Sequence, residues 1–151
     1  MYLGKHVTVD LFDVNMEKLT NLNKNDTNMD VWDSYIKKVL CDAHITLINT
    51  SWHNFDNNGA FTALYLLAES HLSIHTWPEH SYIAVDVFTC GDSNTQLVVD
   101  QIVRYFEPQR VQMNRLNRGE ITSKNTFDIS ISNSNSISNS KNTYDTESLL
   151  Y

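Results

Sequence analysis

The sequence predicts an α+β protein, a two-layer sandwich in which helices pack on one face of a mainly antiparallel sheet. Segments with strand patterns outnumber segments with helical patterns. Links of hairpin length dominate between the strands, and such links join antiparallel neighbours. Both helical segments repeat their apolar residues at helical spacing, so each can cover one face of a sheet.

The first half of the chain alternates strand, loop, helix and strand. Residues 5–12 alternate polar and apolar side chains, which is typical of a half-buried strand. Residues 21–28 are polar and predict a loop. Residues 46–55 return to strand character. Between them, residues 31–43 predict an amphipathic helix, because two adjacent apolar rows recur at helical spacing (Val31, Tyr35, Val39 and Trp32, Ile36, Leu40).

The second half is mostly strands. A turn is expected at 56–59, and Pro78 marks a connection between two strands. Pro108 closes a predicted helix. The resulting order is β-α-β-β-β-α-β, give or take one strand at the Ser70 junction. The predicted strands here are 61–68, 72–76, 82–89 and 110–118, and the predicted helix is 94–106.

A change in composition divides the chain into a patterned body, residues 1–120, and a tail, residues 121–151. The tail holds eight Ser and five Asn among scattered apolar side chains. Such a segment cannot bury enough apolar surface to offset its ordering entropy, so we expect it to be disordered. We assign it no function.

Composition excludes several classes of protein. The formal charge of −7 and the lack of a Lys/Arg cluster argue against nucleic acid as a partner. No run approaches the roughly 20 apolar residues of a membrane span, and no signal peptide is recognisable, so a cytoplasmic location is expected. The two cysteines, Cys41 and Cys90, are expected to be free thiols, with Cys41 in a structural role.

One short run concentrates chemical groups. ESHLSIHTWPE, residues 69–79, holds the Ser70 hydroxyl together with two imidazoles and two carboxylates. The Ser70 hydroxyl can attack the Glu69 carbonyl and convert the amide into an ester, through an oxyanion that needs hydrogen-bond donors nearby. Removal of the Ser70 α-proton then expels the Glu69 carboxylate, and the dehydroalanine left behind hydrolyses to a pyruvoyl group. Because this requires a β-heteroatom, alanine cannot replace Ser70.

This run, followed by DVFTCG at residues 86–91, resembles the self-cleaving proenzymes of the small bacterial and archaeal S-adenosylmethionine decarboxylase family. The resemblance is strongest over 53–91, and residues 4–6 and 118–119 resemble the family's first and last strands. It implies decarboxylation of S-adenosylmethionine to the aminopropyl donor of spermidine and polyamine synthesis. It also implies a homo-oligomer of cleaved protomers, a dimer or higher, with both subunits contributing to the active sites.

The resemblance also implies cleavage between Glu69 and Ser70, and roles for individual residues. Ser70 becomes the pyruvoyl cofactor, which forms a Schiff base with the substrate amine and accepts electrons as CO2 leaves. His75 is the base in processing, a task that suits an imidazole because it titrates near neutral pH. Cys90 is the proton donor after decarboxylation, and Thr62 assists processing.

Two further positions resemble the family's substrate contacts. Phe55 matches an aromatic side chain that stacks on adenine, with His75 on the other side. Glu79 matches the carboxylate that accepts hydrogen bonds from the ribose hydroxyls. The chain departs from the family at GAFT, residues 59–62, where Phe61 is an apparent insertion before Thr62.

Other interpretations stay open at this point. The same machinery could serve a pyruvoyl-dependent decarboxylase of ornithine or arginine, or the chain could be an inactive regulatory paralogue. His71 and His75 share a face of a strand and could begin a metal site with His53, His80 or Cys90. No spacing matches a zinc signature, so we expect no metal. His53, His71 and His80 are expected to pack or hydrogen-bond, and Trp52 and Trp77 to lie in the core or an interface.

Overall fold

The computed structural model describes residues 2–22, 26–55 and 58–121, and the side chains of 26–29 are outside that description. Along the chain the elements are β1 (Tyr2–Phe12), α1 (Met16–Leu22), α2 (Asp26–Asp42), β2 (Leu47–Asn54), β3 (Phe61–Leu67), β4 (Ser70–Trp77), the 3-10 helix η1 (Pro78–His80), β5 (Tyr82–Cys90), α3 (Thr95–Phe106) and β6 (Arg110–Glu120). The predicted tail, apart from Ile121, lies outside the described residues.

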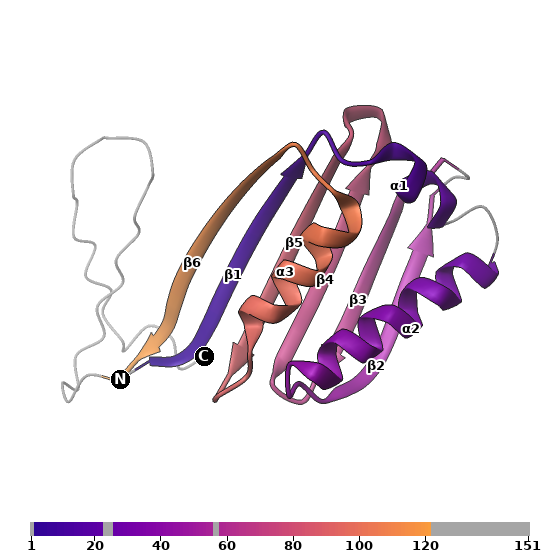
Figure 1. Ribbon diagram of the computed structural model, residues 1–151. Coiled ribbons are helices and arrows are strands. Elements are labelled where there is room, and N and C mark those ends of the chain that lie inside the picture. Colours follow the sequence, from indigo (N-terminus) through magenta and orange to yellow (C-terminus); the bar gives the residue numbers. More distant parts are fainter. Residues whose placement is uncertain (1, 23–25, 56–57, 122–151) are drawn as a thin grey trace, which may run out of the picture. The chain divides into compact units, whose positions relative to one another are not determined.

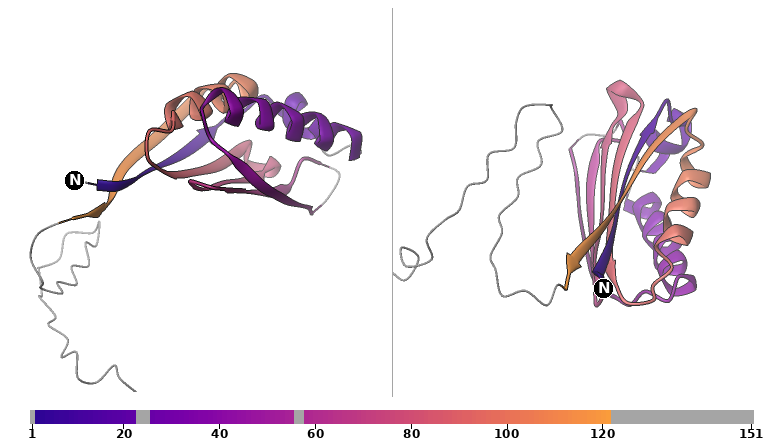
Figure 2. Two further views of the ribbon diagram at one scale, coloured as in Figure 1. Left: turned by 90° about the horizontal axis from the view of Figure 1, so that it is seen from below. Right: turned by 90° about the vertical axis from the view of Figure 1, so that its left-hand side faces the viewer.

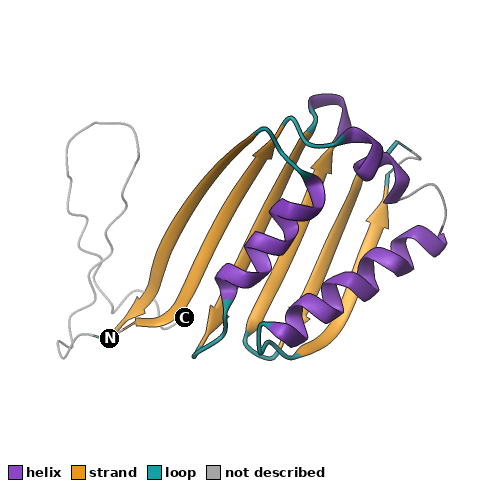
Figure 3. Ribbon diagram, in the orientation of Figure 1, coloured by secondary structure: helices purple, strands orange, loops and turns teal. Residues whose placement is uncertain are grey.

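The strands form one antiparallel sheet in the order β2-β3-β4-β5-β1-β6 (Figure 1). The helices lie on one face of this sheet, as the views in Figure 2 and the colouring in Figure 3 make clear. None of the helices in the described residues lies on the other face, which we call the open face. The predicted α+β sandwich, with helices on one face of an antiparallel sheet, is confirmed.

Strict alternation along the central strands produces the two faces. In β3, Phe61, Ala63, Tyr65 and Leu67 are buried, and the residues between them are not. β5 repeats the pattern with Ile83, Val85, Val87 and Thr89. Because successive side chains of a strand point to opposite faces, the buried set faces the helices and the intervening set lies on the open face.

The helices α2 and α3 cover the core on one face of the sheet. Trp32 and Ile36 of α2 and Ile102 and Phe106 of α3 are at most 1% exposed. The ring of Trp32 lies 5.2 Å from that of Phe106 and 4.7 Å from that of Tyr105, so aromatic packing joins the two helices. Asn94 caps the start of α3 by accepting a hydrogen bond from the Leu97 N–H.

One predicted loop is wrong. Residues 21–28 are not a continuous loop, because α1 runs to Leu22 and α2 begins at Asp26. The region is polar and α1 buries only Leu19 and Leu22, so no apolar pattern indicated this helix. At Ser70 the chain makes a tight hairpin, so β3 and β4 are separate strands, in agreement with the predicted strands 61–68 and 72–76, and the sheet has the additional strand that the predicted order allowed at this junction.

Two tryptophans, Trp52 and Trp77, were predicted to lie in the core or an interface. They are 37% and 39% exposed, so neither belongs to the core of this chain, and a place in an interface stays a prediction. The fully buried tryptophan is Trp32. Trp52 pairs with buried Ala63 and lies on the helix side near the edge of the sheet. Trp77 lies on the open face, against the ring of Tyr82 at 5.2 Å.

Candidate active site

The predicted site residues gather at the two ends of β4. At its start, the cleavage-site residues Glu69 and Ser70 adjoin Cys90, the last residue of β5. We call these three residues the cleavage group. Toward the other end, His75 of β4 and Thr62 of β3 form a cross-strand pair on the open face.

The cleavage group is built on a two-residue turn. Leu67 pairs with Ser70, so only Ala68 and Glu69 connect β3 to β4. The backbone N–H of Cys90 donates to the carbonyl oxygen of Glu69 at 3.1 Å, and this is the carbonyl that self-cleavage would attack. Cys90 is exposed and its thiol is free. The structure therefore places Glu69, Ser70 and Cys90 next to one another.

The backbone of Ser70 has an unfavourable conformation. Its φ angle is +150°, in the region that favours glycine. A residue held in such a region costs on the order of 1–3 kcal/mol and persists only where its surroundings enforce it. Here the enforcement comes from pairing on both sides, with Leu67 in β3 and Thr89 in β5. The predicted scissile bond is thus attached to a strained residue.

The second group gives His75 a defined partner. Nδ1 of His75 lies 3.0 Å from the hydroxyl oxygen of Thr62, so this histidine and hydroxyl act as one unit. His53 of β2 pairs with Thr62 from the other side, and Phe55 contacts the ring of His53 at 4.9 Å. Phe55 is 65% exposed and free to stack on a planar ligand. Glu79 follows at the end of β4, in η1.

Within one chain the two groups do not meet. Five residues separate Ser70 from His75 along β4, and an extended strand rises about 3.3 Å per residue, so their Cα atoms lie about 17 Å apart. A base must come within hydrogen-bond reach of its proton. His75 of the same chain therefore cannot serve Ser70.

The imidazole nearest Ser70 belongs to His71. Its Nδ1 lies 3.3 Å from the Ser70 hydroxyl oxygen, and its ring contacts Phe88 at 5.9 Å and His6 at 6.3 Å. His71 thus packs and hydrogen-bonds, in agreement with the sequence analysis. What the sequence did not indicate is that its hydrogen-bond partner is the nucleophile itself.

A polar network beside the cleavage group was also missed. Nε2 of His6 lies 3.0 Å from an Asp86 carboxylate oxygen, and its Nδ1 lies 3.2 Å from the Arg118 guanidinium. Arg118 also lies over the ring of Phe88, at 5.3 Å. These residues come from β1, β5 and β6, so only the strand order brings them together.

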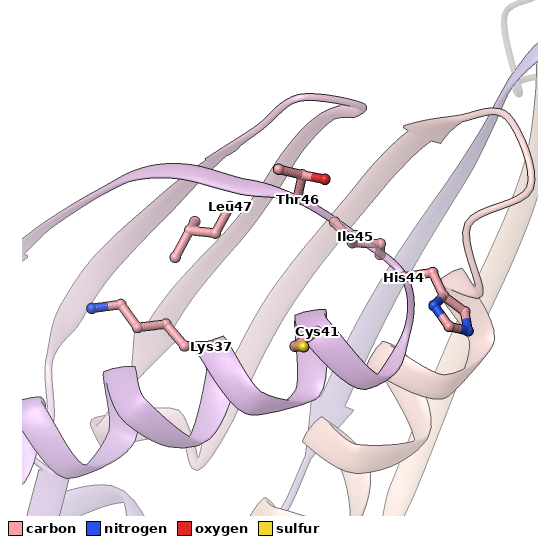
Figure 4. A pocket seen from close by; sticks show the side chains of 6 residues that line it. All are labelled: Lys37, Cys41, His44, Ile45, Thr46 and Leu47. Atoms are coloured by element: carbon pink, nitrogen blue, oxygen red, sulfur yellow. The ribbon is translucent and has the colours of Figure 1, made fainter.

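No metal site is present among the residues that the structure describes, because no group of three or more His, Cys, Asp or Glu side chains converges there. Within the same residues, no helix is long and apolar enough to cross a bilayer. Cys41 is exposed and lines a shallow pocket (Figure 4). Its lining residues come from α2 and the segment leading into β2: Lys37, Cys41, His44, Ile45, Thr46 and Leu47.

Tyr82, at the far end of the open face, predicts a loss of stability in alkali. Its hydroxyl donates to Asp10 at 2.5 Å, and burial, then this hydrogen bond, raises the pKa of Tyr82 from 10.0 to about 12. Between these values the unfolded chain has lost a proton that the folded chain keeps. The free energy of unfolding therefore falls as pH rises from about 10 to 12.

Urea unfolding of the wild type and Tyr82→Phe at pH 9, 10 and 11 measures this effect. We expect a shallower decline for Tyr82→Phe, which cannot ionise at this position. Tyr65, Tyr35 and Tyr105, whose pKa values burial also raises, remain in both proteins and cancel in the comparison. Equal declines would show that Tyr82 does not hold its proton in the folded state.

Fold and site together define a class, that of two-layer sandwiches with a serine at a strained hairpin and a cysteine alongside. Comparison with known proteins makes this specific. The sequence model of the family described as "S-adenosylmethionine decarboxylase" matches residues 5–119. The chain belongs to this family. Members of the family depend on a pyruvoyl group derived from a serine, so the predicted family and cofactor are confirmed.

Individual relatives agree with the family match. An S-adenosylmethionine decarboxylase proenzyme of Sulfurihydrogenibium sp. is 35% identical, over 79% of this chain and 84% of the relative. One from Aquifex aeolicus is 36% identical, over 78% and 82%. The crystal structure of the Aquifex aeolicus adenosylmethionine decarboxylase superposes with a TM-score of 0.69 at 31% identity, covering 83% of this chain and 98% of that one. The chain is thus related to enzymes.

Proposed function

We propose that this protein cleaves itself between Glu69 and Ser70 and then decarboxylates S-adenosylmethionine to the aminopropyl donor of polyamine synthesis. The observation that carries the proposal is the hairpin, where a strained serine follows a carbonyl that already accepts a hydrogen bond from Cys90. Relatives named as S-adenosylmethionine decarboxylase proenzymes support the substrate and the self-processing. Two exposed, free thiols support a reducing, cytoplasmic location.

The residues around Ser70 suit a pyruvoyl group at that position. Such a group supplies a ketone that binds the substrate amine and withdraws electrons as CO2 leaves. The exposed Cys90 thiol adjoins the cleavage hairpin and is the proposed proton donor to the carbon that loses CO2. Because Cys90 ends β5 beside the start of β4, sheet pairing holds donor and acceptor at a fixed spacing.

We further propose that each active site is shared between two copies of the chain. The distance of about 17 Å from Ser70 to His75 in one chain leaves the cleavage group without its predicted base. Consider two copies whose sheets face each other, related by a twofold axis in the plane between the sheets. The axis runs perpendicular to β4 and passes over the point midway between Ser70 and His75. It brings Ser70 of each copy opposite His75 of the other. Facing sheets pack about 10 Å apart, which side chains from both sides can span.

The open face has the character of an interface. Leu64, Leu66 and Leu116 are 50%, 53% and 49% exposed on it, and no described helix covers them. Leu66, His71, Phe88, His6 and Leu116 follow one another across five strands in a single register row. Three of these five side chains, Leu66, Phe88 and Leu116, are apolar. Exposed apolar side chains on a sheet face that no described helix covers support burial against a second, identical face.

Phe55 and Glu79 are the proposed substrate contacts, and their removal tests the choice of S-adenosylmethionine. Stacking on a base contributes about 1–3 kcal/mol, so Phe55→Ala should raise KM for S-adenosylmethionine about 5- to 150-fold. Glu79→Ala should raise it about 10- to 150-fold, through loss of hydrogen bonds to a charged acceptor. Release of labelled CO2 from carboxyl-labelled substrate gives both values.

The matched control is Trp52→Ala, which removes an exposed aromatic from the helix side of β2, the strand that ends just before Phe55. It should leave KM unchanged, and all three variants should still cleave themselves. An unchanged KM in Phe55→Ala and Glu79→Ala would rule out the proposed nucleoside contacts. Activity on ornithine or arginine in place of S-adenosylmethionine would contradict the proposed substrate.

A further inference from the structure

The cleavage turn is held by a residue that no sequence motif contains. The backbone of Thr46, just before β2, meets the turn twice. Its carbonyl oxygen accepts from the Ala68 N–H at 2.9 Å, and its N–H donates to the side-chain carboxylate of Glu69 at 3.0 Å. Since a hydrogen bond to a carboxylate is among the stronger ones in proteins, this contact fixes the Glu69 side chain.

On its other side, Glu69 is held through its backbone. The Cys90 N–H donates to its carbonyl oxygen at 3.1 Å. Glu69 is thus held by two hydrogen bonds. The Thr46 N–H, just before β2, binds its carboxylate, and the Cys90 N–H, at the end of β5, binds its carbonyl oxygen. The strained residue Ser70, with φ of +150°, follows directly. Because Glu69 is held by both hydrogen bonds, the direction of its carbonyl group beside Ser70 is fixed.

We propose that Glu69 is a positioning residue for self-cleavage: the Thr46 N–H holds its carboxylate, and this keeps its carbonyl on the Cys90 N–H, the donor to the oxyanion. The inference rests on the proposed function. It adds a role for the side chain of Glu69, which the cleavage chemistry itself does not use, and for the backbone of Thr46 and Cys90.

The chemistry gives the Cys90 N–H a role at each step. Oγ of Ser70 bonds to the Glu69 carbonyl carbon, the C–N bond breaks, and the hydroxyl proton ends on the Ser70 nitrogen. During this step the carbonyl oxygen becomes an oxyanion, to which the N–H donates more strongly than to the neutral carbonyl. When the Ser70 α-proton is removed, the Cβ–O bond breaks and the same oxygen belongs to the departing Glu69 carboxylate.

The hydrogen bond from the Thr46 N–H to the Glu69 carboxylate keeps the Glu69 carbonyl aligned with the Ser70 hydroxyl. Attack within a chain is fast only when the reacting atoms are held in near-attack geometry, and small displacements are costly. A two-residue turn without its side-chain anchor can pivot about Glu69. We therefore expect the first step, conversion of amide to ester, to slow when the Glu69 carboxylate is removed.

The experiment compares Glu69→Ala with Glu69→Gln. The glutamine side chain keeps an oxygen that can accept from the Thr46 N–H, whereas alanine keeps none. We expect cleavage of Glu69→Ala, followed by intact mass over time, to slow about tenfold or more. Glu69→Gln should stay within about threefold of the wild type. Glu120→Ala, which removes an exposed carboxylate at the end of β6, is the control and should cleave normally.

Two more measurements separate positioning from a general loss of structure. Unfolding of both Glu69 variants in a Ser70→Ala background reports stability without interference from cleavage, and the two should unfold alike. Hydroxylamine, which cuts esters, should release no more fragments from Glu69→Ala than that variant forms by itself, because slow ester formation leaves no ester to accumulate.

Wild-type rates in Glu69→Ala would overturn the inference, as would a Glu69→Gln variant as slow as Glu69→Ala. Additional fragments released by hydroxylamine from Glu69→Ala, beyond those it forms by itself, would contradict it too, since they would show an accumulated ester and put the defect after the ester. A wild-type chain that never cleaves is a different result, because it would overturn the proposed function itself.

Discussion

Ser70→Ala yields a single uncleaved chain without decarboxylase activity. Alanine has no β-heteroatom, so neither the ester nor the elimination that follows can occur, and no pyruvoyl group is made. The expected loss is complete within the detection limit of a labelled-CO2 assay. Denaturing mass spectrometry of the same preparation should give the full-length mass.

The variant should nevertheless fold, since Ser70 lies at the start of β4 and contributes nothing to the buried core. Ser51→Ala serves as control, because it removes an exposed serine of β2 that is not part of the cleavage turn. It should cleave and react normally. Cleavage of Ser70→Ala at the 69/70 bond would contradict the proposed chemistry, because it would require another nucleophile.

Mixing two inactive variants should restore activity, and this is the second large effect that we expect. Ser70→Ala lacks the nucleophile and His75→Ala lacks the base, so neither should cleave alone. In a mixed dimer with shared sites, one site combines the intact Ser70 of the His75→Ala chain with the intact His75 of the Ser70→Ala chain. Co-expression should therefore cleave only the chain that carries His75→Ala.

The mass of the fragments identifies which chain was cut, and a third variant gives the matched control. His71 contacts Ser70 within its own chain, at 3.3 Å. If His71 were the base, His71→Ala would fail to cleave even when mixed with Ser70→Ala, whereas His75→Ala would cleave alone. That pattern, or no cleavage in the mixture of Ser70→Ala and His75→Ala, would contradict the shared site.

The sheet was predictable because its strands obey simple alternation. β1, β3 and β5 bury every second residue, so their polar and apolar pattern is visible in the sequence. The helix α3 was equally clear from its apolar spacing and its bounding Asn94 and Pro108. The short helix α1 was not, because it buries only two residues and its neighbourhood is polar. Periodicity reveals an element only when that element has enough of a buried face.

The site was predictable as a set of residues but not as an arrangement. Ser70, His75 and Cys90 were indicated by the resemblance of residues 69–79 and 86–91 to the family. Their separation into two groups follows from β4 being extended over that whole stretch, which places Ser70 and His75 at a distance. The contacts of Glu69 with Thr46 and Cys90 are made by backbone N–H groups. Every residue but proline has one, so no residue pattern could indicate them.

The measurement that tests the central claim most directly is the intact mass of the purified wild-type chain under denaturing conditions. We expect two chains, residues 1–69 and residues 70–151, the second carrying a pyruvoyl group in place of its amino-terminal serine and resisting Edman degradation. A single chain of full-length mass would contradict self-cleavage at Glu69–Ser70. It would favour the inactive regulatory paralogue instead.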